Sequence, residues 1–422
     1  MSTPNQSLFA VPYGHTGRIF SVLIVLAICS LVVSSKVAGA LFWGLAMVGA
    51  ALSLRNHRVA SRQSASSRLT WSIAALPVVL NIASVLWHRL PAREISWLPF
   101  LALPFLVTLL RRVELGLPVL VWGATAACIT AFASAALSWL HFGQARTSLD
   151  MNAIVFAQIT LALCVVCLWT CYERVRYGLP WLLPVAALSG IAAALVSGFR
   201  GGLLALPVML TAFLHLGERR ANAGRRSRWP AALLVAALLG TMIAIAGNRL
   251  SIVERLGTIW QEVDSYRHGV IQFSPAGSRL AMWQAAIELT GRNPLFGIGA
   301  RQFSSGLKQL LEQGRFPRDV ELFHHAHNTY LNIAAEYGII GLATFGLLLS
   351  LIWRALGQSE PGARRVGRLS LACWMIFALT NDVLAHQNTL RAMMLTLAVC
   401  LAASPRDRGP ITGTAKPAAP DR

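Results

Sequence analysis

Residues 324–353 read HHAHNTYLNIAAEYGIIGLATFGLLLSLIW, and this stretch decides the fold. A helix that crosses a bilayer needs an apolar run of roughly 17–25 residues, and the run that begins at Thr329 has that length. Three histidines stand before the run, and Asn328, Asn332 and Glu336 follow at intervals of four residues. The stretch therefore predicts a membrane-spanning helix with titratable groups at its start.

The same apolar character extends over the whole chain of 422 residues. Hydrophobic residues make up 55% of the sequence and charged residues 13%, with a mean hydropathy of +0.56. An ordinary soluble domain has about 25% charged residues. The composition predicts an all-α polytopic membrane protein. No cleavable signal peptide is expected, because the first apolar run, near Ile19, has no small-residue cleavage site after it.

Twelve apolar runs predict twelve membrane-spanning helices with one long interruption. Residues 19–247 hold the first nine spans and residues 329–404 the last three. The individual spans are expected at 19–35, 37–54, 69–87, 96–110, 117–140, 151–171, 179–198, 201–216, 230–247, 329–353, 369–386 and 390–404. All seven cysteines fall inside these runs, so no disulfide is expected. Three of them have a spacing that could suggest a metal site, but inside a spanning helix we interpret them as small packing residues: Cys164, Cys167 and Cys171.

The arginines predict the orientation of the chain in the membrane. They cluster in the loops that follow even-numbered spans, at 55–68, 111–116, 172–178, 217–229 and 354–368. Because short cytoplasmic loops carry an excess of Lys and Arg, both termini are expected in the cytoplasm, residues 1–18 at one end and a disordered tail of residues 405–422 at the other. The formal charge of +20 thus reflects topology, and we expect no binding to nucleic acid.

The interruption at residues 248–328 is expected to form a partly helical cap on the extracytoplasmic surface of the membrane. Long loops of this kind are often functional. Ser278 is expected to cap one helix, NPLFGIG at 293–299 to end it, and residues 304–313 to form another. Two sets of apolar residues are each expected to share a helical face, namely Ile252, Leu256, Ile259 and Val263, and Leu280, Trp283 and Ile287.

Two arginines on the extracytoplasmic side are candidates for binding an anion. Arg200 lies in SGFRGG at 197–202, where glycines permit a tight turn and the next helix starts with free N–H groups. Arg279 lies near the start of a predicted helix. A phosphate group would suit both arginines, since a guanidinium group can donate two parallel hydrogen bonds to two phosphate oxygens. The alternatives are contact with lipid headgroups for Arg200 and a structural salt bridge for Arg279, and Arg301 is interpreted as a surface charge.

Three interpretations are open for His324, His325 and His327. A metal site needs converging ligands, commonly spaced i, i+4 on a helix, whereas His324 and His325 are adjacent and no HExxH or clustered carboxylate follows. A general base needs one histidine with a pKa near neutrality within reach of a substrate hydroxyl, and His327 suits that role. The third interpretation is helix capping and interfacial polarity. We expect no metal ligand among the three.

Asn328, Asn332 and Glu336 are expected on one face of the tenth span. Glu336 would lie about 12 Å along the helix from Asn328. A carboxylate at that depth is costly unless it is paired or faces water. Glu336 is therefore a candidate for a functional role or for a buried polar network.

Other small or polar residues in the spans are expected mainly to hold helices together. A second face of the tenth span should admit a neighbouring helix closely, and it comprises Ala334, Gly338, Gly341 and Phe345. Three polar residues near the extracytoplasmic ends of other spans are lesser candidates for a functional role: Asn152, Asn381 and Asp382.

The spacing around His327 resembles a known signature. His327-Asn328, followed by nine residues and then GIIG at 338–341, resembles the signature of bacterial O-antigen ligases of the WaaL type. That signature is His, then Asn, Ser or Gln, nine residues, and GxxG. Its position directly after the large extracytoplasmic loop also fits that family.

Further segments resemble the wider family of O-antigen ligases, O-antigen polymerases and protein O-oligosaccharyltransferases. Residues 279–303 carry the similar elements RLxxW, which ends at Trp283, then NPLFGIG and Phe303. Arg200 is similar to the arginine that this family carries between two spans before its large periplasmic loop. The resemblance covers about residues 150–400, and the first four spans carry no recognisable motif.

The resemblance implies a glycosyltransferase with a GT-C-like membrane fold in the bacterial inner membrane. Its donor would be O-antigen polysaccharide on undecaprenyl diphosphate, and its acceptor a sugar hydroxyl of lipid A–core oligosaccharide. His327 would be the base, and Arg200 and Arg279 would bind the diphosphate, in an inverting reaction without metal or nucleotide cofactor. Weaker candidates are Asn328, Arg301, Trp283, Asn152 and Glu336.

Three other functions compete with the ligase. An O-antigen polymerase uses the same donor with a lipid-linked acceptor. A protein O-oligosaccharyltransferase usually has a further soluble part near its C-terminus, where this chain has eighteen residues after the last predicted span. A twelve-span transporter or flippase would often show internal repeats, and we find no clear repeat between the halves.

Overall fold

The computed structural model describes residues 15–55, 65–142, 150–173, 182–197, 264, 275–316 and 323–403. This part of the chain is helical throughout and contains no strand, as the composition predicts. The α-helices are α1 (His15–Ser30), α2 (Ser35–Arg55), α3 (Ala65–Trp87), α4 (Pro99–Arg112), α5 (Leu117–Phe142), α6 (Ala153–Glu173), α7 (Leu182–Val196), α11 (Pro275–Arg292), α12 (Phe303–Glu312), α13 (Thr329–Gly357), α14 (Pro361–Phe377) and α15 (Gln387–Ala402). A short 3-10 helix, η1 (Ala92–Glu94), joins α3 to α4.

Each predicted span that falls in the described residues overlaps one helix, from α1 to α7 and from α13 to α15. The span predicted at 369–386 is wrong in its bounds, because α14 ends at Phe377 and residues 378–386 form the loop before α15. The predicted spans 201–216 and 230–247 lie outside the described residues, as does the predicted face that starts at Ile252. Five segments are long and apolar enough to cross a membrane: Ser35–Arg55, Ser67–Trp87, Leu117–Ser138, Ala153–Thr170 and Thr329–Gly357. The described part is therefore all-helical and consistent with a multi-pass membrane protein, and α1 and α7 are shorter apolar helices.

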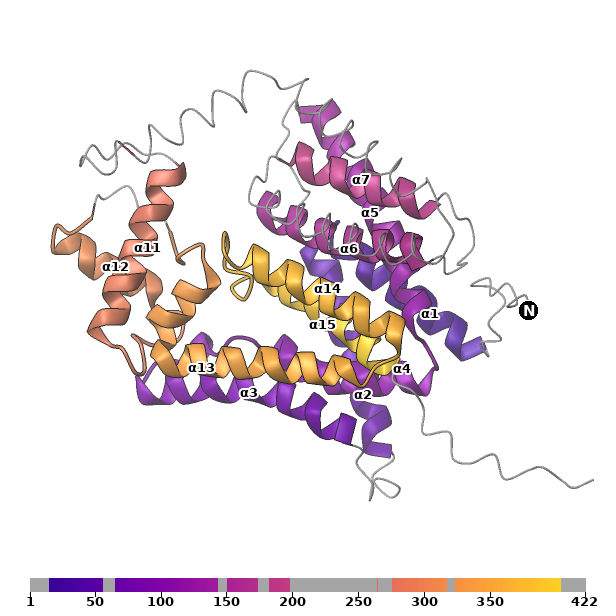
Figure 1. Cartoon of the computed structure of the whole chain (residues 1–422), viewed down its shortest axis with the longest axis horizontal. Helices are drawn as coiled ribbons and strands as arrows, with labels where there is room; N and C mark the ends of the chain where they lie inside the picture. Colours follow the sequence, from indigo (N-terminus) through magenta and orange to yellow (C-terminus); the bar gives the residue numbers. More distant parts are fainter. Residues whose placement is uncertain are drawn as a thin grey trace, which may run out of the picture.

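The helices pack as two groups with α14 and α15 between them (Figure 1). On one side α1 packs on α5, and α5, α6 and α7 pack on one another. On the other side α2 and α3 pack on α4, and α13 lies along α3. Because α15 packs against α4 and α14 packs against α6, the loop between α14 and α15 lies among helices from both groups.

Small side chains permit these close contacts. A Cβ added to Gly190 of α7 would collide with the sulfurs of Cys164 and Cys128 in α6 and α5. A Cβ added to Gly49 of α2 would collide with the backbone of Phe105 in α4. Between membrane helices, where no hydrophobic effect favours association, such close packing is a main source of stability. The cysteines of the described part, Cys164 among them, are free thiols.

A second, smaller core lies beyond the N-terminal end of α13, where α11 and α12 pack (Figure 1). Its buried side chains come from α11, α12, the segment before α13 and α13 itself, and include Met282, Leu289, Phe303, Leu310 and Ala335. The helix predicted at 304–313 is confirmed as α12.

One detail predicted for α11 is wrong. The helix begins at Pro275, so Ser278 lies inside its first turn and is not its N-cap. Leu280, Trp283 and Ile287 share a face of this helix as predicted, and that face is not the buried one, since Ile287 is 60% exposed. Alanines such as Ala281 and Ala285 face the small core instead, because they let α11 approach α13 closely.

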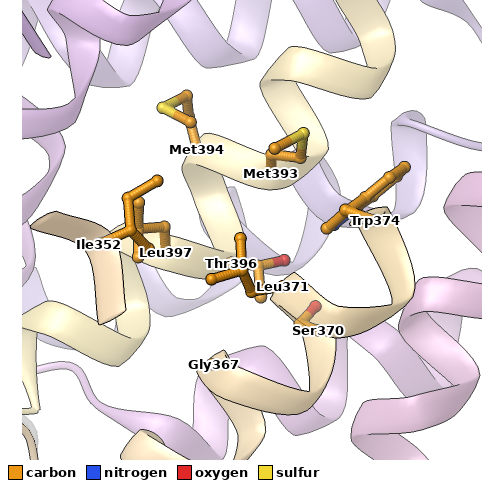
Figure 2. Close-up of a pocket in the computed structure, with 9 residues that line it drawn as sticks. All are labelled: Ile352, Gly367, Ser370, Leu371, Trp374, Met393, Met394, Thr396 and Leu397. Carbon is orange, nitrogen blue, oxygen red and sulfur yellow. The ribbon is translucent and has the colours of Figure 1, made fainter. Parts of the chain in front are cut away.

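A shallow pocket lies between α13, α14 and α15 (Figure 2). It is lined by Ile352, Gly367, Ser370, Leu371, Trp374, Met393, Met394, Thr396 and Leu397. No titratable side chain lines it, and Ser370 and Thr396 are its polar residues. Chemistry must be sought elsewhere, at the N-terminal end of α13.

Candidate active site

The segment before α13 is held by hydrogen bonds on both sides. Asn328 is the N-cap of α13, with a φ of −154° and a side-chain oxygen that accepts a hydrogen bond from the N–H of Leu331 at 3.1 Å. The N–H of Thr329 donates to the carbonyl oxygen of Ala378 at 2.8 Å. The start of α13 is thereby fastened to residues 378–386, which connect α14 to α15.

His327, directly before this cap, has an unusual backbone for its residue type. Its φ of 49° lies in the left-handed region, which costs about 1–3 kcal/mol for a residue other than glycine. Its ring packs edge-on against Phe323, with centroids 5.7 Å apart, and its Nδ1 lies 3.3 Å from Oδ1 of Asn381. Strain of this kind persists only where the surroundings hold it, and it is common at functional sites.

His327 belongs to a group of three histidine rings. The ring centroid of His325 lies 4.2 Å from that of His327 and 5.6 Å from that of His386, the N-cap residue of α15. The N–H of His327 also donates to Nδ1 of His325 at 3.3 Å. His324 is exposed, and its Nδ1 lies 3.4 Å from the hydroxyl of Ser304. The sequence singled out three of these histidines but not His386.

The electrostatics of the group keep His327 uncharged at neutral pH. Burial lowers the pKa of His327 to about 3, and the charges of His325, Arg279 and His386 act in the same direction. The hydrogen bond to Asn381 opposes this shift. Burial likewise lowers the pKa of His325 to about 4. A neutral imidazole has a lone pair on one nitrogen, but a pKa of about 3 is far below the near-neutral value expected of a general base, so His327 of the free protein is a weak base.

Arg279 comes together with His327 although the two lie in different segments. Arg279 stands in the first turns of α11, which packs against α13, and its charge is one of those that lower the pKa of His327. Trp283 lies one turn further along α11 and is half-buried, and its indole N–H makes no hydrogen bond within the described residues. The guanidinium group of Arg279 therefore lies near enough to the imidazole of His327 for its charge to affect the pKa of that ring.

The first glycine of the GIIG motif breaks α13. Gly338 has φ 64° and ψ −157°, so two helical segments meet there. In the break, the N–H of Ile339 donates to the carbonyl oxygen of Pro294 at 2.8 Å, and the N–H of Ile340 donates to that of Leu295 at 3.3 Å. A Cβ on Gly338 would collide with both of those carbonyl groups. The NPLFGIG loop thus supplies hydrogen-bond acceptors that the broken helix lacks.

The face of α13 that includes Gly338 and Gly341 was predicted to admit a neighbouring helix, and this prediction is wrong in part. Gly338 admits the backbone of a loop and not a neighbouring helix, and a Cβ on Gly341 would collide with Tyr337 of the same helix. The loop forms two more backbone hydrogen bonds, from Ile298 to Ala335 at 2.9 Å and from Gly299 to the carbonyl oxygen of residue 336 at 3.0 Å. The two motifs, NPLFGIG and GIIG, form one structural unit.

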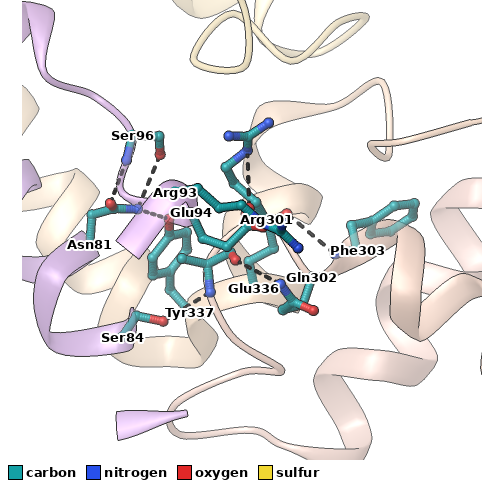
Figure 3. A network of polar contacts seen from close by, with 11 residues as sticks. Asn81, Ser84, Arg93, Glu94, Ser96, Arg301, Gln302, Phe303, Glu336 and Tyr337 are labelled. Atoms are coloured by element: carbon teal, nitrogen blue, oxygen red, sulfur yellow. Dashed lines mark hydrogen bonds and ion pairs between the residues drawn. The ribbon is translucent and has the colours of Figure 1, made fainter. Parts of the chain in front are cut away.

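Glu336, with its bond to Phe303 (Figure 3), and Asn332 also hold this unit together. The carboxylate of Glu336, which is 5% exposed, accepts a hydrogen bond from the N–H of Phe303 at 3.4 Å and interacts with the N–H of Arg301 and the side chain of Asn332. The side-chain oxygen of Asn332 accepts a hydrogen bond from the N–H of Ala326 at 3.1 Å. The buried carboxylate is thus satisfied by the start of α12, and its contacts are structural.

Comparison with known proteins shows which family part of this sequence resembles. Residues 185–346 match the family model of O-antigen ligases. This segment, less than half of the chain, is similar to O-antigen ligases. A stretch of 165 residues, 39% of the chain, is also 23% identical to a protein of Haemophilus influenzae described as an uncharacterized protein, of which it covers 40%.

The region that matches O-antigen ligases contains some parts of the candidate site and not others. Arg279, the NPLFGIG loop and His327 lie inside residues 185–346, whereas Asn381 and His386 lie after them. Gln158, which accepts a hydrogen bond from Asn381 at 3.2 Å, lies before them. No motif in the sequence marks Gln158 or His386, because only the packing of α6, α14 and α15 brings them to His327.

The remaining candidates lie elsewhere. Arg200 is outside the described residues. Arg301 is 58% exposed, and its Nε lies 3.7 Å from Oε2 of Glu94. Asn152 is exposed, and its side chain accepts a hydrogen bond from the N–H of Ile154 at 2.8 Å, close to the start of α6. Within the described ranges, no three His, Cys, Asp or Glu side chains are arranged to hold a metal ion.

Proposed function

We propose that this protein is an O-antigen ligase. It transfers O-antigen polysaccharide from undecaprenyl diphosphate to a sugar hydroxyl of lipid A–core oligosaccharide, as the final step in assembling lipopolysaccharide. The observation that carries the proposal is the pairing of a cationic Arg279 with a neutral His327, since glycosyl transfer from a diphosphate needs an anion-binding group beside a base. The match of residues 185–346 to the family model of O-antigen ligases supports it.

The reaction is a direct displacement at the anomeric carbon. The acceptor hydroxyl gives its proton to His327 as its oxygen forms a bond to that carbon. The bond between the carbon and the phosphate oxygen breaks on the opposite side, and undecaprenyl diphosphate leaves with the electron pair. Arg279, with Arg200 as a second candidate, stabilises the negative charge that develops on the leaving group. The anomeric configuration is inverted.

Binding of the donor makes His327 a stronger base. In the free protein, the positive charge of Arg279 disfavours the imidazolium form of His327. A diphosphate bound to Arg279 cancels that repulsion, so the pKa of His327 rises when the donor is in place. A transferase must avoid activating water in place of its acceptor. A base whose basicity rises only when the donor is bound meets this need.

The proposal places the protein in the bacterial inner membrane with its active site facing the periplasm. Both termini are cytoplasmic, with nine spans in residues 19–247 and three in 329–404. Residues 248–328 form the periplasmic cap. The arginine-rich loops support this orientation, because they all fall on one side of the predicted membrane. Membrane lipids are the surrounding partners, as the apolar helices require.

Reconstitution of the purified protein in liposomes tests the choice of acceptor. The liposomes receive an undecaprenyl-diphosphate glycan, with either rough lipopolysaccharide or a second lipid-linked glycan as the acceptor. Transfer to rough lipopolysaccharide alone is expected. Transfer to the lipid-linked glycan alone would make the protein a polymerase, and transfer to neither would reject glycosyl transfer to lipid-bound acceptors. Inhibition by a chelator would contradict the metal-independent mechanism.

A further inference from the structure

His327 is connected to two buried amide side chains that no motif of the chain includes. Its Nδ1 lies 3.3 Å from Oδ1 of Asn381, and Nδ2 of Asn381 donates a hydrogen bond to Oε1 of Gln158 at 3.2 Å. Asn381 and Gln158 are both 0% exposed. Three separate parts of the fold therefore meet here: the start of α13, the loop between α14 and α15, and α6.

The orientation of the two amides in the structure favours one tautomer of His327. An amide NH₂ only donates and an amide oxygen only accepts. Because the NH₂ of Asn381 donates to Gln158, its oxygen faces His327, and Nδ1 of His327 must then carry the hydrogen. The lone pair of the neutral ring is left on Nε2, which has no hydrogen-bond partner within the described residues. A general base must present such a lone pair to its substrate.

Asn381 is itself rigidly held. Its N–H donates to the carbonyl oxygen of Phe377 at 3.0 Å, and its carbonyl oxygen accepts a hydrogen bond from the hydroxyl of Thr329 at 3.0 Å. Thr329 also accepts a hydrogen bond from the N–H of Val383 at 3.0 Å. The backbone of Asn381 is therefore fixed relative to the first residue of α13, two positions after His327.

We propose that Asn381 is a positioning residue that holds His327 in the tautomer with the hydrogen on Nδ1, and that Gln158 holds the amide of Asn381 in the orientation this requires. The inference rests on the proposed function, in which Nε2 of His327 removes the proton of the acceptor. It adds two residues outside the region matched to O-antigen ligases.

An amide suits this position better than a carboxylate. A carboxylate would also orient the ring, but it would stabilise the imidazolium form and raise the pKa of His327. An amide oxygen orients the ring with a smaller effect on its charge. His327 also faces Arg279, His325 and His386, whose positive forms all oppose protonation. The group as a whole keeps His327 neutral in the free protein.

The tautomer can be read directly by ¹⁵N NMR of the resting protein. Histidine-selective labelling is used, and the signals of His327 are assigned by their loss in His327→Gln. In the wild type at neutral pH, a protonated Nδ1 and an unprotonated Nε2 are expected. In Gln158→Leu the Asn381 amide is free to turn, and a mixture of tautomers is expected. A proton on Nε2 in the wild type would mean that both amides are turned over, and would overturn the proposal.

Kinetics with matched variants test whether the tautomer matters for turnover. Asn381→Leu removes the acceptor, so kcat should fall about 10²-fold with little change in the KM of the donor. Asn381→Asp restores an acceptor, so it should recover part of kcat and show an acidic limb at higher pH than the wild type. Asn388→Leu, which alters a buried asparagine bonded to Arg391 in α15, should leave kcat within about twofold.

The two measurements separate failure of this inference from failure of the proposed function. If the NMR tautomer is as expected but Asn381→Leu keeps wild-type kcat, Asn381 does not act in turnover and the positioning role is rejected. An equal loss in Asn381→Leu and Asn381→Asp, without a shifted pH profile, would assign Asn381 a merely structural role. The NMR result requires no substrate, so it stands whichever glycan the protein transfers.

Discussion

At the scale of single residues, His327 combines three features that are seldom found together. It has a left-handed backbone, a buried ring and a cationic neighbour, Arg279. Each of these costs free energy, and none of them helps helix α13 to form. Asn328, the residue after it, provides the N-cap and has a structural role. Of the pair His327-Asn328, we therefore propose a chemical role for the histidine alone.

Replacing Arg279 by glutamine should change both the affinity for the donor and the pKa of His327. Loss of the positive charge removes a repulsion that disfavours imidazolium, so the pKa of His327 rises from about 3 towards its ordinary value of 6.5. The pH profile of kcat/KM should then gain an acidic limb at a higher pH than that of the wild type. The KM of the donor should rise at least about tenfold, as one charged hydrogen bond is lost.

Arg292→Gln is the matched control for that variant. Arg292 ends the same helix, α11, and its guanidinium is bonded to Glu288 at 2.7 Å, away from the histidines. It should leave both the KM of the donor and the pH profile unchanged. Equal behaviour of the two variants would reject the assignment of Arg279 to the diphosphate.

At the scale of elements, the site depends on the break in α13. The helix could be predicted from its apolar run, and its first residue at Thr329 is the predicted one. The break could not, because a glycine in a helical pattern is compatible with an unbroken helix. Its conformation depends on the backbone of Pro294 and Leu295, which reaches Gly338 only in the folded protein. The contact between the NPLFGIG loop and α13 also brings Glu336 next to the start of α12, where it accepts a hydrogen bond from Phe303.

Gly338→Ala should separate the NPLFGIG loop from α13. Alanine is strained at φ 64°, and its Cβ would collide with the carbonyl groups of Pro294 and Leu295. A loss of stability of at least about 2 kcal/mol is expected, together with faster proteolysis in the loop. Thermal unfolding in detergent and limited proteolysis measure the two effects.

The control is Gly346→Ala in the same helix. A Cβ on Gly346 meets no atom within 4 Å, so this variant should be as stable as the wild type or slightly more so. A similar small effect of both substitutions would show that the loop does not depend on Gly338.

At the scale of the whole molecule, the protein has a large membrane bundle and a small separate core that meet at the histidines. Sequence patterns predicted the spans in the described part because apolar runs of membrane length are strong signals. They also singled out Arg279 and His327, which short motifs mark, as candidates for the site. They did not single out Gln158 or His386, and they gave Asn381 only a minor place. These residues approach His327 through the packing of α6, α14 and α15, which no local pattern encodes.

The histidine group should make the folded protein sensitive to acid. The pKa values of His325 and His327, about 4 and about 3, lie below the ordinary value of 6.5 that applies to the unfolded chain. Between these values the unfolded chain binds more protons, so the free energy of unfolding falls as the pH falls below 6.5. The melting temperature in detergent should therefore decrease from about pH 7 to pH 5.

The double variant His325→Gln/His327→Gln shows whether the histidines cause this decrease. Its melting temperature should fall less over the same pH range, since glutamine does not titrate. A wild type that is equally stable at both pH values would contradict the neutral state of the group. So would a double variant with the same dependence on pH as the wild type.

The most direct test of the account is the single-turnover rate of glycan transfer by His327→Gln. Wild-type and variant proteins are reconstituted with saturating undecaprenyl-diphosphate glycan and rough lipopolysaccharide, without metal or nucleotide. Binding of the donor is measured separately. The account predicts that the variant binds the donor as the wild type does and transfers the glycan at least about 10²-fold more slowly. A variant that transfers at the wild-type rate would show that His327 is not the base.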